Sequence, residues 1–358
     1  MTQLREFSDL LLNWYSDHKR DLPWRRTKIA YRIWVSEIIL QQTRVAQGMD
    51  YYKKFLSRFP TVNKLAGASE DEILKIWQGL GYYSRARNMH ATAQILVEKY
   101  DGQFPDNYNE LIQLKGIGPY TASAIASICF GEPRPVVDGN VMRVIARYCG
   151  LEIPVNSNEG IKRIHELAEQ FMEATTPGDY NQAIMELGAL ICVPQKAQCQ
   201  KCPVNKECVA FNLGITDKLP IKTKKSKIKN RYLDYLCVVK NNSIYLFKRG
   251  DNDIWKGLYD MPFLEHIQPK PVNETLDDLQ TKFPESSVKK MKTESEWHVH
   301  LLSHQRIHAR YWHLEPSESS QFNYQNAEPV SFGTIEKYPV SKLTERFFYD
   351  CCFPIFVA

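Results

Sequence analysis

Four cysteines lie close together in the chain, with a spacing that could hold a metal centre. They are separated by six, two and five residues, as Cys192, Cys199, Cys202 and Cys208. Four thiolates on one loop could surround a single tetrahedral zinc ion or a cubane iron–sulfur cluster, and the spacing does not choose between them. Because four protein ligands leave no open coordination position, we expect a structural or electrostatic centre rather than a hydrolytic one. Four unligated buried thiols are the weaker alternative.

A glycine-containing turn could bind a phosphate group. Within residues 114–122, Gly116 and Gly118 permit backbone conformations that other residues disfavour, and Pro119 suits the first turn of a following helix. Free backbone amides at such a helix N-terminus form an anion site. We therefore expect both glycines to contact phosphate. The alternative is an ordinary tight turn between two helices.

Helices over the first 210 residues or so must position these groups. Apolar residues recur at helical spacing from Leu4 to Trp14, and Ser69 is a suitable N-cap for a helix over 70–77. Further helices are expected over 33–45, 107–114, 120–129, 140–149, 160–174 and 180–192. Glycine and proline residues separate them. This part of the chain is therefore predicted to be all-α.

After a basic segment, residues 218–231, the pattern changes to strands. That segment carries seven basic residues and no acidic one, which is typical of a linker and would also allow phosphate contacts. Beyond it, alternating residues predict two strands, over 232–239 and 243–248, around a turn at Asn241-Asn242. Other β-rich stretches are expected over 297–302, 307–314 and 348–357, with a helix over 274–283. We predict a separate α+β domain over 232–358.

The composition excludes several classes of protein. The chain has 358 residues, of which 43% are hydrophobic and 24% charged, so collagen, coiled coil and general disorder are excluded. No apolar run reaches the ~18–20 residues that span a bilayer. The formal net charge of +5 would suit a polyanionic partner, as it would many metabolic enzymes. The first residues lack the core of an export signal, so we expect a cytoplasmic location, where clustered cysteines indicate metal rather than disulfides.

Taken together, the motifs resemble a known family of DNA repair enzymes. The glycine turn, residues 136–143 and the cysteine array resemble the helix-hairpin-helix Gly/Pro-Asp superfamily of DNA glycosylases. The match narrows to the MutY-type adenine DNA glycosylases through three further segments, residues 22–25, 34–43 and 79–88. The resemblance covers residues 1–215 closely and the C-terminal domain more loosely.

This resemblance implies an activity, a cofactor and a domain organisation. The expected activity is removal of adenine mispaired with 8-oxoguanine, or with guanine, from double-stranded DNA, by a monomeric bacterial enzyme that is nucleoid-associated when bound to DNA and has no membrane partner. The cofactor would be a [4Fe–4S] cluster on the four cysteines rather than zinc. The expected domains are a catalytic domain over 1–217, with a six-helix subdomain (22–131) and an iron–sulfur subdomain (1–21 with 132–217), the linker, and a Nudix-like 8-oxoguanine recognition domain.

Two carboxylates at matching positions could divide the chemistry of glycosidic bond cleavage. Glu37 lies among apolar residues, so partial burial would raise its pKa and suit it to protonate adenine at N7. Asp138 immediately precedes a helix, whose amides would keep it ionised to stabilise the sugar cation. The alternatives without chemistry are a solvent-facing glutamate and a simple N-cap. The resemblance adds Asn140 as an organiser of Asp138 and of water, and Tyr120 near the sugar.

Tyr120 also indicates the type of reaction. Glycosylase/lyases of the endonuclease III type carry a Schiff-base lysine at this hairpin position, whereas a phenol cannot form an imine, so we expect a monofunctional glycosylase. Lys115, where many relatives have proline, is an amine at a different position of the turn. Two alternatives stay open: an endonuclease III-like pyrimidine glycosylase/lyase, and a catalytically silent DNA-binding module, which the presence of both carboxylates opposes.

The resemblance also assigns substrate contacts, because a base must leave the stack to be reached. The residues expected around the extruded adenine are Trp24, Arg25 and Gln182. Those expected in the duplex gap or beside 8-oxoguanine are Gln42, Thr43, Tyr82, Ser303 and His304. The last two follow Leu302, where the family commonly has phenylalanine.

The C-terminal domain shows no second activity. The chain lacks the Gly-x5-Glu-x7-Arg-Glu-x2-Glu-Glu signature of Nudix hydrolases, so no pyrophosphohydrolase activity is expected. Four histidines lie within eleven residues, as His298, His300, His304 and His308. A zinc site is conceivable from this pattern, but alternation along a strand explains it more simply.

Overall fold

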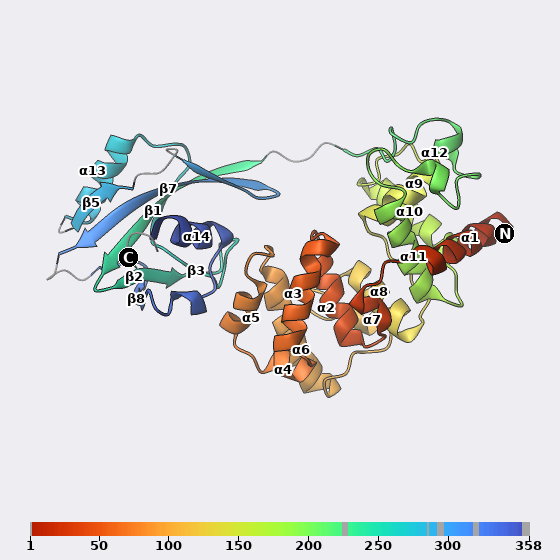
Figure 1. Ribbon diagram of the computed structural model, residues 1–358, viewed down its shortest axis with the longest axis horizontal. Coiled ribbons are helices and arrows are strands. Elements are labelled where there is room, and N and C mark those ends of the chain that lie inside the picture. The colour runs from red at the N-terminus through yellow and green to blue at the C-terminus, as the bar shows by residue number, and fades with distance from the viewer. Residues whose placement is uncertain (1, 224–227, 285, 292–296, 318–321, 353–358) are drawn as a thin grey trace. The chain divides into compact units, whose positions relative to one another are not determined.

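The computed structural model describes residues 2–223, 228–284, 286–291, 297–317 and 322–352. The chain divides into two compact units (Figure 1). The helical unit consists of Met1–Gly67 and Asn88–Lys224, and the sheet unit consists of Ala68–Arg87 and Lys225–Ala358. A short segment from the first hundred residues therefore groups with the C-terminal sheet. Within the described ranges, no helix has both the length and the apolar character that crossing a membrane would require.

The helical unit confirms the predicted all-α class. Its helices are α1 (Thr2–His18), η1 (Pro23–Arg26), α2 (Ala30–Leu40), α3 (Val45–Arg58), α4 (Val62–Ala66), most of α6 (Ser84–Tyr100), α7 (Tyr108–Leu111), α8 (Pro119–Phe130), α9 (Gly139–Tyr148), α10 (Asn158–Phe171), α11 (Pro177–Leu190), η2 (Cys199–Lys201) and α12 (Val209–Asn212). The helices α3 and α6, and the short helices α4 and α12, were not predicted from the sequence.

Two helices with long buried stretches, α2 and α8, and a third helix, α11, form the centre of this unit. In α2, every residue from Ile33 to Ile39 is buried, and in α8 the same holds from Thr121 to Ile128. The small side chains of α8, including Ala122 and Ala126, allow α2 to approach closely. The third helix, α11, packs against α1, α8 and α9. A core of this kind fixes the ends of α2, α8 and α9 in space, and these ends carry the candidate site.

The helix predicted over 33–45 is wrong at its C-terminal end. The helix α2 stops at Leu40, and α3 starts at Val45. Between them Gln42 adopts a left-handed backbone conformation with φ of 60°, which cannot continue a helix. The sequence contains no glycine or proline at this break. The helical spacing of apolar residues therefore predicted one continuous helix across it. The break matters because it places Gln42 and Thr43 on an irregular loop.

The described part of the sheet unit contains a mixed sheet, three whole helices and two short helical segments. Its elements in the C-terminal part are β1 (Lys229–Lys240), β2 (Ser243–Lys248), β3 (Tyr259–Asp260), β4 (Phe263–His266), α13 (Val272–Lys282), β5 (Ser286–Lys290), β6 (His298–Leu301), β7 (Gln305–Pro316), β8 (Glu328–Ser331), η3 (Ile335–Lys337), α14 (Lys342–Phe347) and η4 (Phe348–Cys352). The helix α5 (Glu70–Trp77) joins them from the earlier part of the chain.

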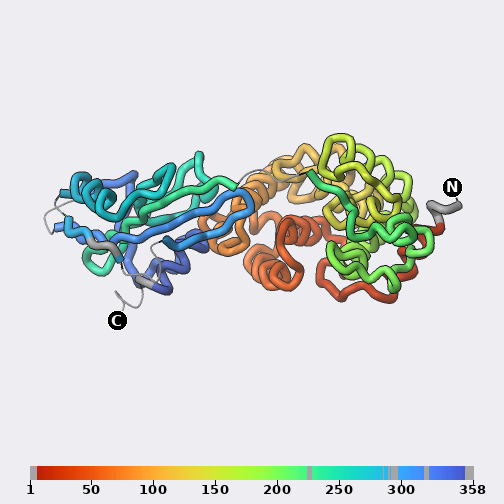
Figure 2. Tube along the Cα trace, turned by 90° about the horizontal axis from the view of Figure 1, so that it is seen from above, coloured from red at the N-terminus to blue at the C-terminus, as the bar shows by residue number. Residues whose placement is uncertain are grey.

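Two long parallel strands, β1 and β7, run side by side through the centre of this sheet (Figures 1 and 2). The main strand order is β3-β2-β1-β7-β5, while β4 pairs with β1, β6 with β7 and β8 with β2. One apolar cluster of this sheet includes Leu236, Trp312 and Leu279 of α13. Beside it, the buried carboxylate of Asp234 accepts hydrogen bonds from Arg310 Nε at 2.6 Å and Trp312 Nε1 at 2.7 Å. Buried charge in this unit is therefore paired.

Most predicted elements of the C-terminal domain are confirmed, and one is wrong. Both Asn241 and Asn242 have positive φ in the turn between β1 and β2, as a tight hairpin requires. The helix predicted over 274–283 is α13. By contrast, residues 348–352 of the predicted last strand form the helical turn η4, because this segment continues directly from α14. The rest of that prediction lies outside the described residues.

Candidate active site

A cavity of about 520 Å³ in the helical unit brings together many of the predicted site residues. Those that line it are Trp24, Arg25, Glu37, Gln42, Thr43, Tyr120, Asp138, Asn140 and Gln182. They come from η1, α2, the loop after α2, the N-terminal ends of α8 and α9, and the middle of α11. Apolar side chains, among them Leu22, Val45 and Met185, complete the walls. A concave, largely apolar wall with a few convergent polar groups is the usual form of a small-molecule site.

Glu37 is a buried carboxyl group at this cavity, with 8% of its surface exposed. Burial raises the pKa of Glu37 to about 7, and the nearby charge of Asp138 acts in the same direction. A hydrogen bond from Tyr120 and the charge of Arg25 oppose this rise in pKa without cancelling it. A carboxyl group with a pKa close to neutrality can hold a proton and release it, as a general acid must.

Tyr120 lies in the first turn of α8, where its hydroxyl donates to Glu37 Oε2 at 2.7 Å and lies 3.3 Å from Met185 Sδ. Burial, together with the charges of Glu37 and Asp138, raises the pKa of Tyr120 well above its ordinary value. The phenol therefore remains neutral and acts as a hydrogen-bond donor. A phenol at this position cannot form a Schiff base, because it has no amine.

Asp138 is the N-cap of α9. Its Oδ1 atom accepts hydrogen bonds from the backbone amides of Asn140 at 2.9 Å and Val141 at 2.8 Å, and its Oδ2 atom accepts from Asn140 Nδ2 at 2.8 Å. Amide donors and the positive end of the helix dipole favour a carboxylate at this place. Asp138 therefore caps α9 and lines the cavity at the same time, so the two roles do not exclude each other.

Asn140 is held at both ends of its amide. While Nδ2 donates to Asp138, Oδ1 accepts from Arg143 NH2 at 2.9 Å. The same guanidinium donates to the carbonyl oxygens of Gly188 at 2.7 Å and Cys192 at 2.6 Å. Arg143 therefore fixes the amide orientation of Asn140. Sequence reasoning missed Arg143, although its place one turn after Asp138 on a short helix was a usable signal.

A second network holds Arg25 at the cavity. The buried carboxylate of Glu186 accepts from both terminal nitrogens of Arg25 at 2.8 and 2.7 Å, and also from the side chain of Arg20. Burial alone would raise the pKa of Glu186, but the hydrogen bonds from Arg25 and Arg20 outweigh it and lower that pKa to about 2. Nearby, Tyr15 donates its hydroxyl to Gln182 Oε1 at 3.2 Å, which leaves the amide nitrogen of Gln182 oriented away from Tyr15. Glu186, Arg20 and Tyr15 were also missed, because their partners lie far away in sequence.

The other predicted substrate contacts belong to the sheet unit. Ser303 and His304 are exposed residues of the tight turn between β6 and β7, which a hydrogen bond from Leu302 N to Gln305 O at 2.9 Å closes. The hydroxyl groups of Ser303 and Tyr82 are hydrogen-bonded to each other. The structure therefore brings Tyr82 and Ser303 together.

The predicted glycine turn joins α7 to α8. Gly116 has φ of 78°, and a Cβ atom there would lie 2.6 Å from Cβ of Asn88, so only glycine fits. Gly118 is the N-cap of α8, where no side chain caps the helix and Pro119 follows as the first helical residue. A Cβ atom on Gly118 would meet nothing within 4 Å, so the space in front of this helix end is open.

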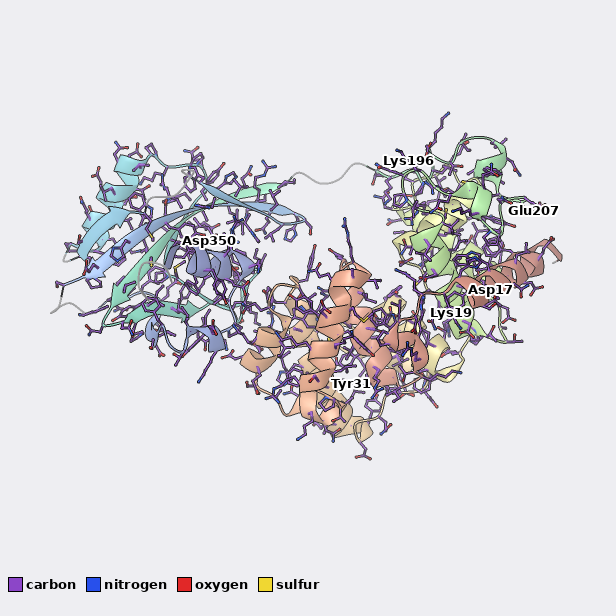
Figure 3. All side chains as sticks on the ribbon, viewed as in Figure 1. Asp17, Lys19, Tyr31, Lys196, Glu207 and Asp350 are labelled. Atoms are coloured by element: carbon purple, nitrogen blue, oxygen red, sulfur yellow. The ribbon has the colours of Figure 1, made fainter. Side chains whose placement is uncertain are left out.

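The four clustered cysteines line one small second cavity, together with Arg147 and Phe211. The guanidinium of Arg147 lies 3.4 Å from Cys192 Sγ and donates to Val193 O at 2.7 Å. Within the described ranges, no group of three or more histidine, cysteine, aspartate or glutamate side chains could hold a metal ion, which applies both to this loop and to the C-terminal histidines of β6 and β7. The three lysines between the cysteines, Lys196, Lys201 and Lys206, are exposed, and Figure 3 labels Lys196 and Glu207 at the surface of this segment.

Comparisons with known proteins agree with this architecture. Residues 35–170 match the family described as HhH-GPD superfamily base excision DNA repair protein. A solved structure described as a thermostable thymine-DNA glycosylase superposes with a TM-score of 0.55 at 30% sequence identity, and the match covers 59% of this chain and 98% of that one. The helical unit, with its hairpin and its buried acid beside a helix-capping aspartate, is thus that of a helix-hairpin-helix DNA glycosylase.

Similarity to named relatives narrows this class. A protein of Buchnera aphidicola (subspecies Acyrthosiphon pisum) named adenine DNA glycosylase is 38% identical over 257 residues, which cover 72% of this chain and 73% of the relative. The human protein of the same name is 44% identical over 219 residues, which cover 59% of this chain and 40% of the relative. The chain belongs to the adenine DNA glycosylase family, as its motifs predicted.

Proposed function

We propose that this enzyme hydrolyses the N-glycosidic bond of adenine paired with 8-oxoguanine, or with guanine, in double-stranded DNA. One observation carries the proposal: Glu37 and Asp138 line one cavity in unlike surroundings, one buried with a raised pKa and one capped by amides. Two such carboxyl groups suit an acid and a cation-stabilising carboxylate. Family membership supports adenine as the base that is released.

In this mechanism, Glu37 transfers its proton to N7 of the adenine. The bond between C1′ and N9 then breaks, and its electron pair returns to the base, which leaves a positive charge on the sugar. The negative charge of Asp138 stabilises this cation. A water molecule adds to C1′ and gives up a proton to Glu37, so that the products are free adenine and an abasic site. Asn140 orients Asp138, and Tyr120 orients Glu37 through the hydrogen bond between them.

The cavity would hold the adenine after it has left the duplex stack. Trp24 is 6% exposed and offers an apolar face, while Arg25 and Gln182 offer donors at fixed positions. Gln42 and Thr43 line the same cavity on the irregular loop after α2, and we assign them to the opposite strand at the gap that the adenine leaves. Tyr82 would enter the duplex gap on the 8-oxoguanine side, and Ser303 and His304 would contact the 8-oxoguanine itself. The sheet unit, Nudix-like in its mixed sheet, would then be the recognition module.

Gly116, Gly118 and the N-terminus of α8 supply the contact with the DNA backbone in this proposal. The helix end is uncapped by side chains and open in front, as a phosphate site requires. The enzyme would bind duplex DNA as a monomer.

The cysteine loop suits a [4Fe–4S] cluster. The four thiols share one small cavity, and the resemblance to the family favours a polynuclear cluster over a single zinc ion. Cys192, Cys199, Cys202 and Cys208 would hold it, and it would tie the loop after α11 to α9 as a structural and electrostatic centre. Arg147 supplies a hydrogen bond to a ligand thiolate.

Replacing Cys202 with serine is expected to lower the iron content from about four atoms per chain and to lower the melting temperature by several degrees, because metal binding is coupled to folding. Iron analysis and calorimetry check this. Cys149→Ser is the matched control, since Cys149 is a free thiol outside this cavity, and it should keep its iron. If both variants contained the same amount of iron, Cys202 would not be a ligand of the cluster.

The test of the proposed function is base release from a panel of duplexes. Adenine should leave A:8-oxoG fastest, A:G more slowly and A:T hardly at all, and thymine should not leave a T:G duplex. Borohydride should trap no covalent adduct on an abasic duplex, because Tyr120 provides no amine. Efficient trapping, or equal rates on A:T and A:8-oxoG, would contradict the proposal.

A further inference from the structure

The segment Ala68–Arg87 belongs to the sheet unit, although more than a hundred residues separate it from the rest of that unit. Its helix α5 is attached at its N-terminal end, where Asp71 Oδ1 pairs with Lys248 Nζ at 2.6 Å and Oδ2 accepts from the Tyr259 hydroxyl at 3.1 Å. At the far end of the segment, Arg87 donates to Lys256 O at 2.7 Å. Contacts at both ends therefore keep this segment with the sheet unit.

A third attachment lies at the C-terminal end of α5, at Gln78. Its Nε2 atom donates to Glu345 Oε1 of α14 at 2.6 Å, and its Oε1 atom accepts from the backbone amide of Val340 at 3.2 Å. Lys75, one turn earlier in α5, donates to both Gln78 Oε1 and Tyr338 O at 3.2 Å. Gln78 thus uses both ends of its amide on the stretch that leads into α14.

The four residues after Gln78 form a loop of defined shape that ends at Tyr82. Gly79, Gly81 and Tyr82 all have positive φ, which glycine adopts without strain and which is uncommon for a residue such as Tyr82. The loop is closed by two hydrogen bonds. Trp77 Nε1 donates to Gly81 O at 3.1 Å, and the backbone N–H of Gly79 donates to the Tyr83 hydroxyl at 3.2 Å. A displacement of Gln78 would therefore be passed on to Tyr82, whose hydroxyl meets Ser303.

We propose that Gln78 is a positioning residue that sets Tyr82 against Ser303, and that it thereby determines how well the enzyme distinguishes 8-oxoguanine from guanine opposite adenine. This inference rests on the proposed function. Gln78 touches neither base nor reacting atoms, because its amide is engaged with Glu345 and Val340. Its effect is on the pair of residues assigned to the 8-oxoguanine strand and not on the chemistry at Glu37.

The test introduces a charge at Gln78 and then compensates for it at Glu345. Gln78→Glu places a second carboxylate against Glu345 and should lower the ratio of adenine release from A:8-oxoG over A:G about five-fold at limiting enzyme concentration. The maximal single-turnover rate at saturating enzyme should stay within about two-fold of the parent, as expected for a change in recognition rather than chemistry. Adding Glu345→Gln restores a donor opposite the new carboxylate, so the double variant should regain the parental ratio.

Two controls complete the experiment. Gln94→Glu makes the same charge change at an exposed position of α6 and should leave the ratio unchanged, which separates the effect from general repulsion of DNA. Gln78→Ala, which removes the contacts without adding a charge, should shift the ratio in the same direction by a smaller factor, and it serves if the glutamate variant folds poorly.

The outcomes distinguish this inference from the function on which it rests. A parent enzyme that releases no adenine from either duplex would end the proposed function. A parent that prefers A:8-oxoG, with Gln78→Glu and Gln78→Ala both retaining that preference, would overturn the role of Gln78 alone. Failure of Glu345→Gln to rescue Gln78→Glu would also overturn it, because the contact between these two side chains is what the proposal requires.

Discussion

Replacing Glu37 with glutamine is expected to slow adenine release from an A:8-oxoG duplex about a thousand-fold, the usual contribution of a general acid. Glutamine keeps the shape of the side chain and can still accept the hydrogen bond from Tyr120, but it has no proton to transfer to the base. Single-turnover kinetics with enzyme in excess would measure the loss, and a binding assay should show that the variant still binds the duplex.

The pH dependence of the parent provides a second measurement of the same group. The pKa of Glu37 is about 7, and only the protonated form can act as the acid, so the rate of the chemical step should be constant below that pH and fall tenfold per pH unit above it. The Glu37→Gln variant should lack this decline. A parent rate that rises with pH through this range would contradict the role of Glu37 as the acid.

The stability of the parent should also fall as the pH rises. Because burial raises the pKa of Glu37 from 4.5 to about 7, the folded state favours the protonated form. Relative to the glutamine variant, the parent keeps its full stability below about pH 4.5 and loses it as the pH rises to about 7, by about 3 kcal/mol in total. Denaturant unfolding at pH 5 and pH 8 would reveal this as a gain in stability of Glu37→Gln that is larger at pH 8.

The sequence could predict those parts of the site that depend on residues close together in the chain. The cysteine spacing, the glycine turn and the N-cap position of Asp138 each depend on residues within one loop or one helix end, and the structure places all three as local sequence rules require. The burial of Glu37 also followed from its apolar neighbours in one helix. The roles of these residues came from the resemblance, not from their spacing.

What could not be predicted depends on distant parts of the chain. Arg143 and Glu186 look like ordinary charged positions of amphipathic helices. The partners that hold them include Gly188, 45 residues from Arg143, and Arg20, 166 residues from Glu186. The break after Leu40 arises from the backbone at Gln42, which no glycine or proline marks. The grouping of Ala68–Arg87 with the sheet unit rests on side-chain contacts such as that between Asp71 and Lys248, whose residue types are common on any surface.

Asp138→Asn is expected to reduce adenine release about a hundred- to a thousand-fold, because it removes the negative charge that stabilises the sugar cation. Asparagine is as good an N-cap as aspartate, so its side-chain oxygen should still accept from the amides of Asn140 and Val141 and α9 should begin at the same residue. The new amide would face Asn140 Nδ2, donor against donor, which costs about 1 kcal/mol. Single-turnover rates, compared with duplex affinity and melting temperature, would separate these effects.

Comparison with Asp138→Ala decides between the two roles of this residue. Alanine removes both the charge and the cap, and loss of the cap costs about a further 1 kcal/mol of stability. If Asp138 served only to cap α9, the asparagine variant would be nearly as active as the parent and only the alanine variant would be impaired. If its charge takes part in the reaction, both variants lose activity to a similar degree while only alanine loses the cap. We expect the second pattern, because the carboxylate that caps α9 also lines the cavity that holds Glu37.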